Sequence, residues 1–224
     1  MDKQTAIINL DTIIKRIEKA RLKVNNHHIV QLVAISKYSK SDDIKTLYDA
    51  GQRAFGENKV QDFKNKIHQL DTLPLSWHFV GSLQTNKINN LIDLNPTLFH
   101  GLDSLDLAYQ LDKKLKIKNK TMNCLLQINS SKEDTKSGVM TEVAIKTFNK
   151  ISQECSNIKL KGVMSIGANS KDEDIVKQSF IDTYDIFTCC KGATICSMGM
   201  SNDLELAIKC GSNMIRVGRD LFKV

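Results

Sequence analysis

The chain has 224 residues and a formal net charge of +7, with 41% hydrophobic and 25% charged residues, a composition typical of a soluble globular protein. The two prolines argue against a proline-rich linker, no apolar run is long enough to cross a membrane, and the N-terminus lacks the basic and apolar blocks of a secretory signal. We therefore expect a cytoplasmic protein built from one large domain or two small ones.

The first predicted element is a helix over residues 5–24, where Ile7, Leu10 and Ile13 recur at helical spacing. Residues 31–36 then form a short apolar run that is typical of a buried strand. From there helices and strands alternate. Further strands are predicted at 53–56, 76–80, 97–100, 121–128, 158–166, 193–197 and 214–217, and further helices at 41–50, 59–70, 87–94, 104–115, 141–155, 172–187 and 202–211.

Eight strands with helices between them indicate βαβ units and a parallel sheet, and eight such units close into a barrel. The predicted fold is a single-domain (β/α)8 TIM barrel over residues 1–224. An open doubly wound sheet is the alternative, less favoured because eight strands are many for an open sheet. Almost nothing follows the last strand, so the helix at 5–24 is expected to be an extra N-terminal helix that covers the gap.

The basic charge and the cysteines argue against two classes of site, a nucleic-acid interface and a metal site. Only five of the 32 basic residues are arginines, and the lysines are scattered beside acidic residues, so we interpret the charge as a solvated surface. A basic module for nucleic acid is the alternative, and the sequence gives it little support. The six cysteines show no C-x-x-C pair and no zinc-type spacing. They are expected to be reduced, mostly buried thiols, and no metal is expected.

Active sites of parallel barrels lie at the carboxyl ends of the strands, and a lysine occupies such a position in this sequence. Lys37 directly follows the strand at 31–36. Its amine would then lie at the barrel mouth, partly desolvated, with a lowered pKa that makes it a nucleophile toward aldehydes. The plain alternative is a lysine that emerges into solvent.

Glycine and serine follow the seventh strand. Gly199 allows a close backbone approach, and Ser201 just before a helix is either an N-cap or a phosphate ligand. Phosphate sites of barrels often lie after strands seven and eight. Gly218, after strand eight, can likewise bring its N–H near an anion.

Two further polar residues lie in predicted strands. Arg216 lies in the predicted buried strand at 214–217, and its charge needs a partner. A structural ion pair and a role at the site are equally open for it. Glu57 is a candidate partner for a nearby cation. His78 alternates with Trp77 and Phe79, so it points into the barrel or its mouth. A satisfied core histidine is the more frequent outcome in general.

Together, a lysine, a phosphate cradle and an arginine suit a cofactor with an aldehyde and a phosphate, which describes pyridoxal phosphate. An arginine at its pyridine nitrogen would leave that nitrogen largely neutral and the electron sink weak. Six segments carry a recognisable set of motifs, at residues 32–37, 55–61, 77–87, 136–138, 197–201 and 215–218. These motifs resemble those of the pyridoxal phosphate homeostasis protein family, which is similar to the N-terminal barrel domain of alanine racemase.

The resemblance implies a role for each site residue. Lys37 would hold pyridoxal 5'-phosphate (PLP) as a Schiff base, and Arg216 would face the pyridine nitrogen. The phosphate would be bound by Ser201 and by the backbone of Gly218 and Arg219. The remaining pocket residues would be Asn58 and His78.

The resemblance also implies a function in intracellular PLP homeostasis without established catalytic turnover, with PLP-dependent apoenzymes as candidate recipients, no nucleic-acid or membrane partner, and a monomer or weak dimer. The alternative is a weak PLP-dependent racemase or another enzyme of the same chemistry. Racemases of this fold use a second base from a C-terminal domain, which we do not expect in this chain. A single lysine base on one face of the substrate carbon does not readily deliver a proton to the other face. Efficient racemisation is therefore not expected.

Overall fold

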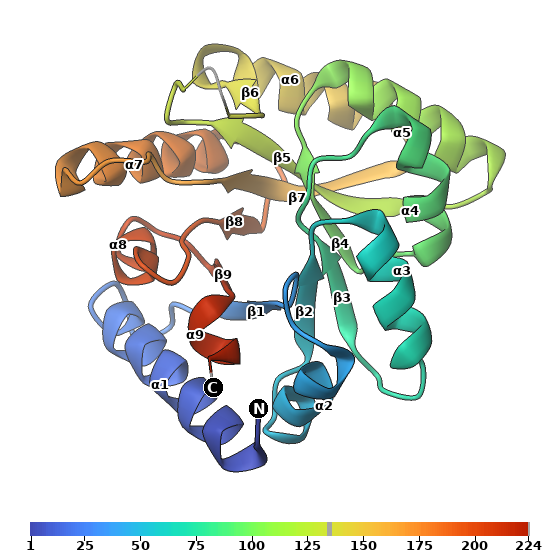
Figure 1. Ribbon diagram of the computed structural model, residues 1–224. Helices are drawn as coiled ribbons and strands as arrows, with labels where there is room; N and C mark the ends of the chain where they lie inside the picture. The colour runs from blue at the N-terminus through green and yellow to red at the C-terminus, as the bar shows by residue number, and fades with distance from the viewer. Residues whose placement is uncertain (134–135, 224) are drawn as a thin grey trace.

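Parallel strands surround a central axis in the computed structural model, which describes residues 1–133 and 136–223 (Figure 1). The sheet has the order β4-β3-β2-β1-β9-β8-β7-β5 and closes where β4 pairs with β5. The short β6 (Val139–Met140) pairs with the end of β5 outside this ring. The barrel strands are β1 (Gln31–Ile35), β2 (Ala54–Glu57), β3 (Ser76–Phe79), β4 (Leu98–Leu102), β5 (Met122–Asn129), β7 (Ile158–Ser165), β8 (Ile195–Ser197) and β9 (Met214–Val217).

Helices follow the strands and surround the barrel (Figure 1). The predicted (β/α)8 barrel is therefore confirmed, and the open-sheet alternative is wrong because β4 pairs with β5. The helices are α1 (Lys3–Arg21), α2 (Ser41–Asp49), α3 (Val60–Gln69), α4 (Ile88–Leu94, after a 3₁₀ turn at Thr85–Lys87), α5 (Leu105–Ile117), α6 (Thr141–Glu154), α7 (Glu173–Cys189), α8 (Leu204–Lys209) and α9 (Arg219–Phe222).

Two elements differ from the predicted pattern. The last strand is followed by α9, a single turn of helix, whereas no helix was expected there. The extra helix α1 packs against α2, α8 and α9, so α1 and α9 cover this side of the barrel together. The two-residue strand β6 was also missed. Both elements are too short to show a hydrophobic period.

The apolar core has two parts because successive strand side chains point to opposite faces of the sheet. Inside the barrel lies a small cluster that includes Val33, Leu98, Leu125, Met164 and Met214. The larger part lies between the strands and the surrounding helices. Four of the six cysteines are buried, at positions 124, 155, 190 and 196, and burial raises the pKa of the Cys155 thiol to about 11.

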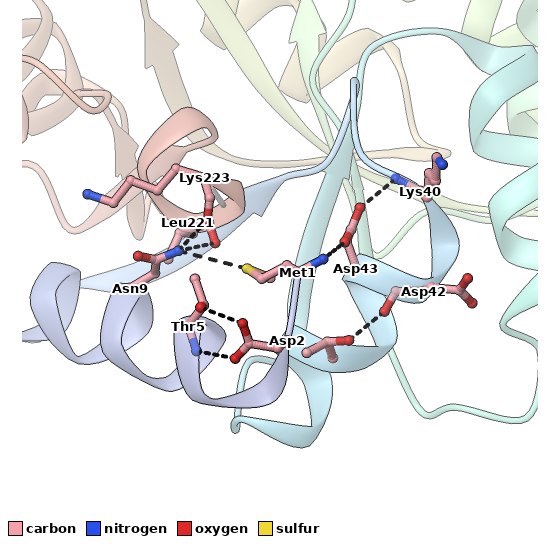
Figure 2. A network of polar contacts seen from close by, with 10 residues as sticks. Met1, Asp2, Thr5, Asn9, Lys40, Asp42, Asp43, Leu221 and Lys223 are labelled. Carbon is pink, nitrogen blue, oxygen red and sulfur yellow. Dashed lines mark hydrogen bonds and ion pairs between the residues drawn. The ribbon is translucent and has the colours of Figure 1, made fainter.

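The first turns of α1 are fixed by polar contacts (Figure 2). Asp2 caps the helix by accepting a hydrogen bond from the backbone N–H of Thr5 at 2.9 Å. One turn further, the Asn9 amide donates to the backbone oxygens of Leu221 (3.3 Å) and Lys223 (2.9 Å). The helix is thereby tied to the segment that contains α9. No helix in the described part of the chain is long and apolar enough to span a membrane.

Candidate functional site

An open cleft of ≈ 1570 Å³ lies at the carboxyl ends of the barrel strands. Its walls come from the segments that follow β1, β2, β3, β5, β7, β8 and β9. Six of the seven predicted site residues line it, namely Lys37, Asn58, Ser201, Arg216, Gly218 and Arg219. The fold therefore brings together side chains from four segments that are far apart in the sequence, as expected for a site on a parallel barrel.

Lys37 continues the row of β1 side chains that points into the barrel. Val33 belongs to the interior cluster and Ile35 packs against it, and the alternation of the strand places Lys37 next in this row. Its side chain is exposed, and its Nζ lies 5.0 Å from the ring centroid of Tyr38. The predicted partial desolvation of the amine is therefore wrong here, because Lys37 lies in the turn beyond the end of β1.

A buried polar cluster supports the chain directly before Lys37. The carboxylate of Glu57, which is 0% exposed, accepts hydrogen bonds through Oε1 from the Ser36 hydroxyl and from Lys66 Nζ, each at 2.6 Å. Lys66 also donates to the Ser36 backbone oxygen at 2.6 Å. Glu57 does pair with a cation, and that cation is Lys66 on α3. Lys66 was not among the predicted site residues. Its position three residues after Phe63 places it on the same, core-facing side of the helix, and this spacing was a signal in the sequence.

Arg216 on β9 is buried and lines the cleft. Its guanidinium donates to the Ser165 backbone oxygen (2.8 Å) and to both the backbone oxygen (2.9 Å) and hydroxyl (2.6 Å) of Ser197. Among the described residues no carboxylate lies within ion-pair distance of it. Burial lowers the pKa of Arg216 to about 10, so the group stays cationic at neutral pH. The structural ion pair is thus not formed, and a buried positive charge faces the cleft.

The segment after β8 bends sharply toward β9. Gly199 has φ +91°, and a Cβ there would lie 2.6 Å from the Cβ of Ala207 on α8, so both backbone and packing require glycine. The backbone N–H of Arg216 donates to the Gly199 oxygen at 3.0 Å. This turn places the half-buried Ser201 on the cleft wall.

The backbone after β9 completes this side of the cleft. Gly218 is the N-cap of α9 and Arg219 is its first residue, so their N–H groups have no acceptor within the helix. Ser201, Gly218 and Arg219 thus offer a hydroxyl and two backbone donors to the same wall. Donors of this kind suit an anion such as a phosphate group.

His78 lies inside the barrel. Its Nδ1 is 2.9 Å from Nε2 of His100 on β4, and its Nε2 is 3.3 Å from the Ser76 hydroxyl. His78 is not among the described residues that line the cleft, and its role in the cofactor pocket stays a prediction. Burial lowers the pKa of His78 to about 4 and that of His100 well below its usual value.

The histidine pair is expected to make stability depend on pH. His78 has a folded pKa of about 4, below its unfolded value of 6.5, so the unfolded chain binds more protons between these values. The stabilising effect is complete above pH 6.5 and is lost as the pH falls toward 4, by about 3 kcal/mol in all. Urea unfolding from pH 7 to pH 5 measures it. His78→Asn should flatten the dependence and His27→Asn should not; equal slopes in the two variants would contradict this account.

The comparisons with known proteins support the barrel fold. Residues 8–224 match the family model described as alanine racemase, N-terminal domain. An alanine racemase from Corynebacterium glutamicum superposes with a TM-score of 0.74 at 14% identity, covering 100% of this chain and 62% of that one. At this identity the match shows the barrel fold alone.

Closer relatives define a narrower group. A pyridoxal phosphate homeostasis protein from Helicobacter pylori (strain J99) is 51% identical over 214 residues, covering 96% of both chains. The structure of PipY from Synechococcus elongatus, described as having PLP bound, matches with a TM-score of 0.80 and 30% identity, covering 93% of this chain and 98% of that one. The chain belongs to the pyridoxal phosphate homeostasis protein family within the alanine racemase N-terminal domain class.

Proposed function

We propose that the protein binds PLP in the cleft, attached through the Lys37 amine, and serves in PLP homeostasis. One observation carries this proposal: an exposed lysine amine, an anion cradle and a buried arginine cation line the same cleft. The PLP-bound structure of PipY and the name of the Helicobacter relative support it.

The residues present fit the chemical groups of PLP. Ser201 and the backbone N–H groups of Gly218 and Arg219 would bind the phosphate, and Lys37 would provide the amine. Asn58, directly after β2, would line the cofactor pocket. His78 remains a predicted pocket residue, although it is not among the described residues that line the cleft. Bound PLP supplies an aldehyde that accepts a primary amine and a pyridine ring that withdraws electrons.

Arg216 would determine how strongly the pyridine ring of bound PLP withdraws electrons. Its partners among the described residues are carbonyl and hydroxyl oxygens and no carboxylate. A guanidinium beside the ring nitrogen would not keep that nitrogen protonated, as a carboxylate would, and the electron withdrawal would therefore be weak. This arrangement favours holding the cofactor over rapid turnover.

We further propose that the protein delivers PLP to apoenzymes in the cytoplasm, as a monomer or weak dimer. The test loads the protein with PLP, removes free cofactor, and adds an apo PLP-dependent enzyme together with a phosphatase that destroys free PLP. We expect the apoenzyme to regain activity despite the phosphatase, whereas PLP carried by serum albumin should fail. If the phosphatase stops activation equally in both cases, the protein stores PLP without delivering it directly.

A further inference from the structure

Arg16 of α1 lies behind the wall of the cleft and contacts three parts of it. Its Nη2 donates to the backbone oxygen of Ser201 at 2.8 Å. Its Nε and Nη2 form a two-pronged contact with the Glu205 carboxylate on α8, at 2.6 and 2.9 Å, and its Nη1 lies 3.3 Å from Oδ2 of Asp220 on α9. One guanidinium thus links the Ser201 turn, α8 and α9.

The two carboxylates that Arg16 contacts belong to the cleft itself. Glu205 and Asp220 both line it, beside Ser201 and Gly218. Their negative charges would oppose an anion bound there. The hydrogen bond from Arg16 lowers the pKa of Glu205 below its usual value and so favours the charged form of the carboxylate. Arg16 therefore compensates negative charge next to the proposed phosphate cradle.

The same helix holds α9 at a second point. Asn9 lies seven residues before Arg16, hence on the same face of α1, and it donates to the backbone oxygens of Leu221 and Lys223 (Figure 2). Arg16 and Asn9 together fix α9 against α1. The position of the Gly218 and Arg219 N–H groups, which begin α9, thus depends on contacts outside the barrel.

We propose that Arg16 is a positioning residue for recognition of the phosphate group, acting through Ser201, Glu205 and Asp220 without touching the ligand. This inference rests on the proposed function and deepens it. The extra N-terminal helix then has a specific role: it sets the geometry and the charge of the anion cradle. The planar fork of arginine matches a carboxylate and a carbonyl at once, and a lysine does not.

The test compares PLP with pyridoxal, which lacks the phosphate, and uses the ratio of their dissociation constants as the readout. Partial unfolding of a variant would weaken the binding of both ligands by the same factor. The ratio therefore distinguishes a loss of phosphate recognition from a loss of stability. Arg16→Met should lower the preference for PLP about tenfold, the effect expected when charge-assisted hydrogen bonds are removed, with little change for pyridoxal. Arg16→Lys, the conservative variant, should give an intermediate ratio and also serves if Arg16→Met does not fold.

Two further variants identify the cause. Removing the uncompensated carboxylate in Arg16→Met/Glu205→Gln should restore part of the preference. Arg21→Met is the matched control, because Arg21 lies on the same helix and pairs with Glu18; its ratio should equal that of the wild type. If the wild type prefers PLP and Arg16→Met and Arg16→Lys keep that preference in full, the inference is overturned. If the wild type itself shows no preference, the proposed phosphate cradle fails instead.

Discussion

Replacing Lys37 with alanine is expected to abolish covalent retention of PLP. The Lys37 amine is exposed at the barrel mouth, whereas the amine of Lys136, another lysine of the cleft, is bound by Glu133 (2.8 Å) and by the Gly167 backbone oxygen (2.9 Å). The anion cradle and Arg216 remain in the variant, so weak binding that gel filtration removes should persist. The measurement is the amount of PLP that stays with the protein through gel filtration.

Lys40→Ala is the matched control for this experiment. Lys40 is an exposed lysine three residues further along the chain, and it is not among the described residues that line the cleft. It should retain PLP as the wild type does. Equal retention by Lys37→Ala and by the wild type would show that Lys37 is not the point of attachment.

Replacing Glu57 with leucine is expected to lower the free energy of unfolding by about 3–5 kcal/mol. Glu57 is fully buried, and the side chain of its ion-pair partner Lys66 is only 11% exposed. The variant would leave the Lys66 ammonium buried without its counter-ion, and the Ser36 hydroxyl would keep only its longer hydrogen bond, to the Gly56 backbone oxygen at 3.4 Å. Urea unfolding at pH 7 measures the change.

The double variant Glu57→Leu/Lys66→Met should recover most of that loss, because replacing both charges of a buried pair with apolar groups is often close to neutral. Glu142→Leu is the matched control, since its pair with Lys132 is exposed on both sides and exposed pairs contribute little. A loss for Glu57→Leu no greater than that for Glu142→Leu would contradict the account.

The sequence was sufficient to predict the barrel, because an apolar run indicated each barrel strand and apolar residues at helical spacing indicated the helices between them. It was also sufficient to predict that Lys37, Ser201 and Arg216 would line one cleft, because strand ends in a parallel barrel meet at one face. Here the prediction depended on local patterns together with one rule about topology. The short elements α9 and β6 carry no such pattern, and both were missed.

The remaining contacts depend on long-range packing, which local patterns do not show. Nothing near Arg16 in the sequence indicates that it would contact Ser201, 185 residues away. The partner of Arg216 could not be predicted either, because the choice between Glu57 and the Ser165 and Ser197 oxygens depends on which strands are neighbours. The strand order places β9 beside β8, which carries Ser197. Glu57 pairs instead with Lys66 on α3.

Attachment of PLP to Lys37 in this cleft is tested most directly by borohydride reduction of the purified protein after incubation with PLP, followed by mass mapping of the peptides. We expect one predominant reduced adduct, on the peptide that carries Lys37, and its loss in Lys37→Ala. No adduct, or an adduct spread over Lys136, Lys171 and Lys209 of the cleft without preference for Lys37, would contradict this expectation.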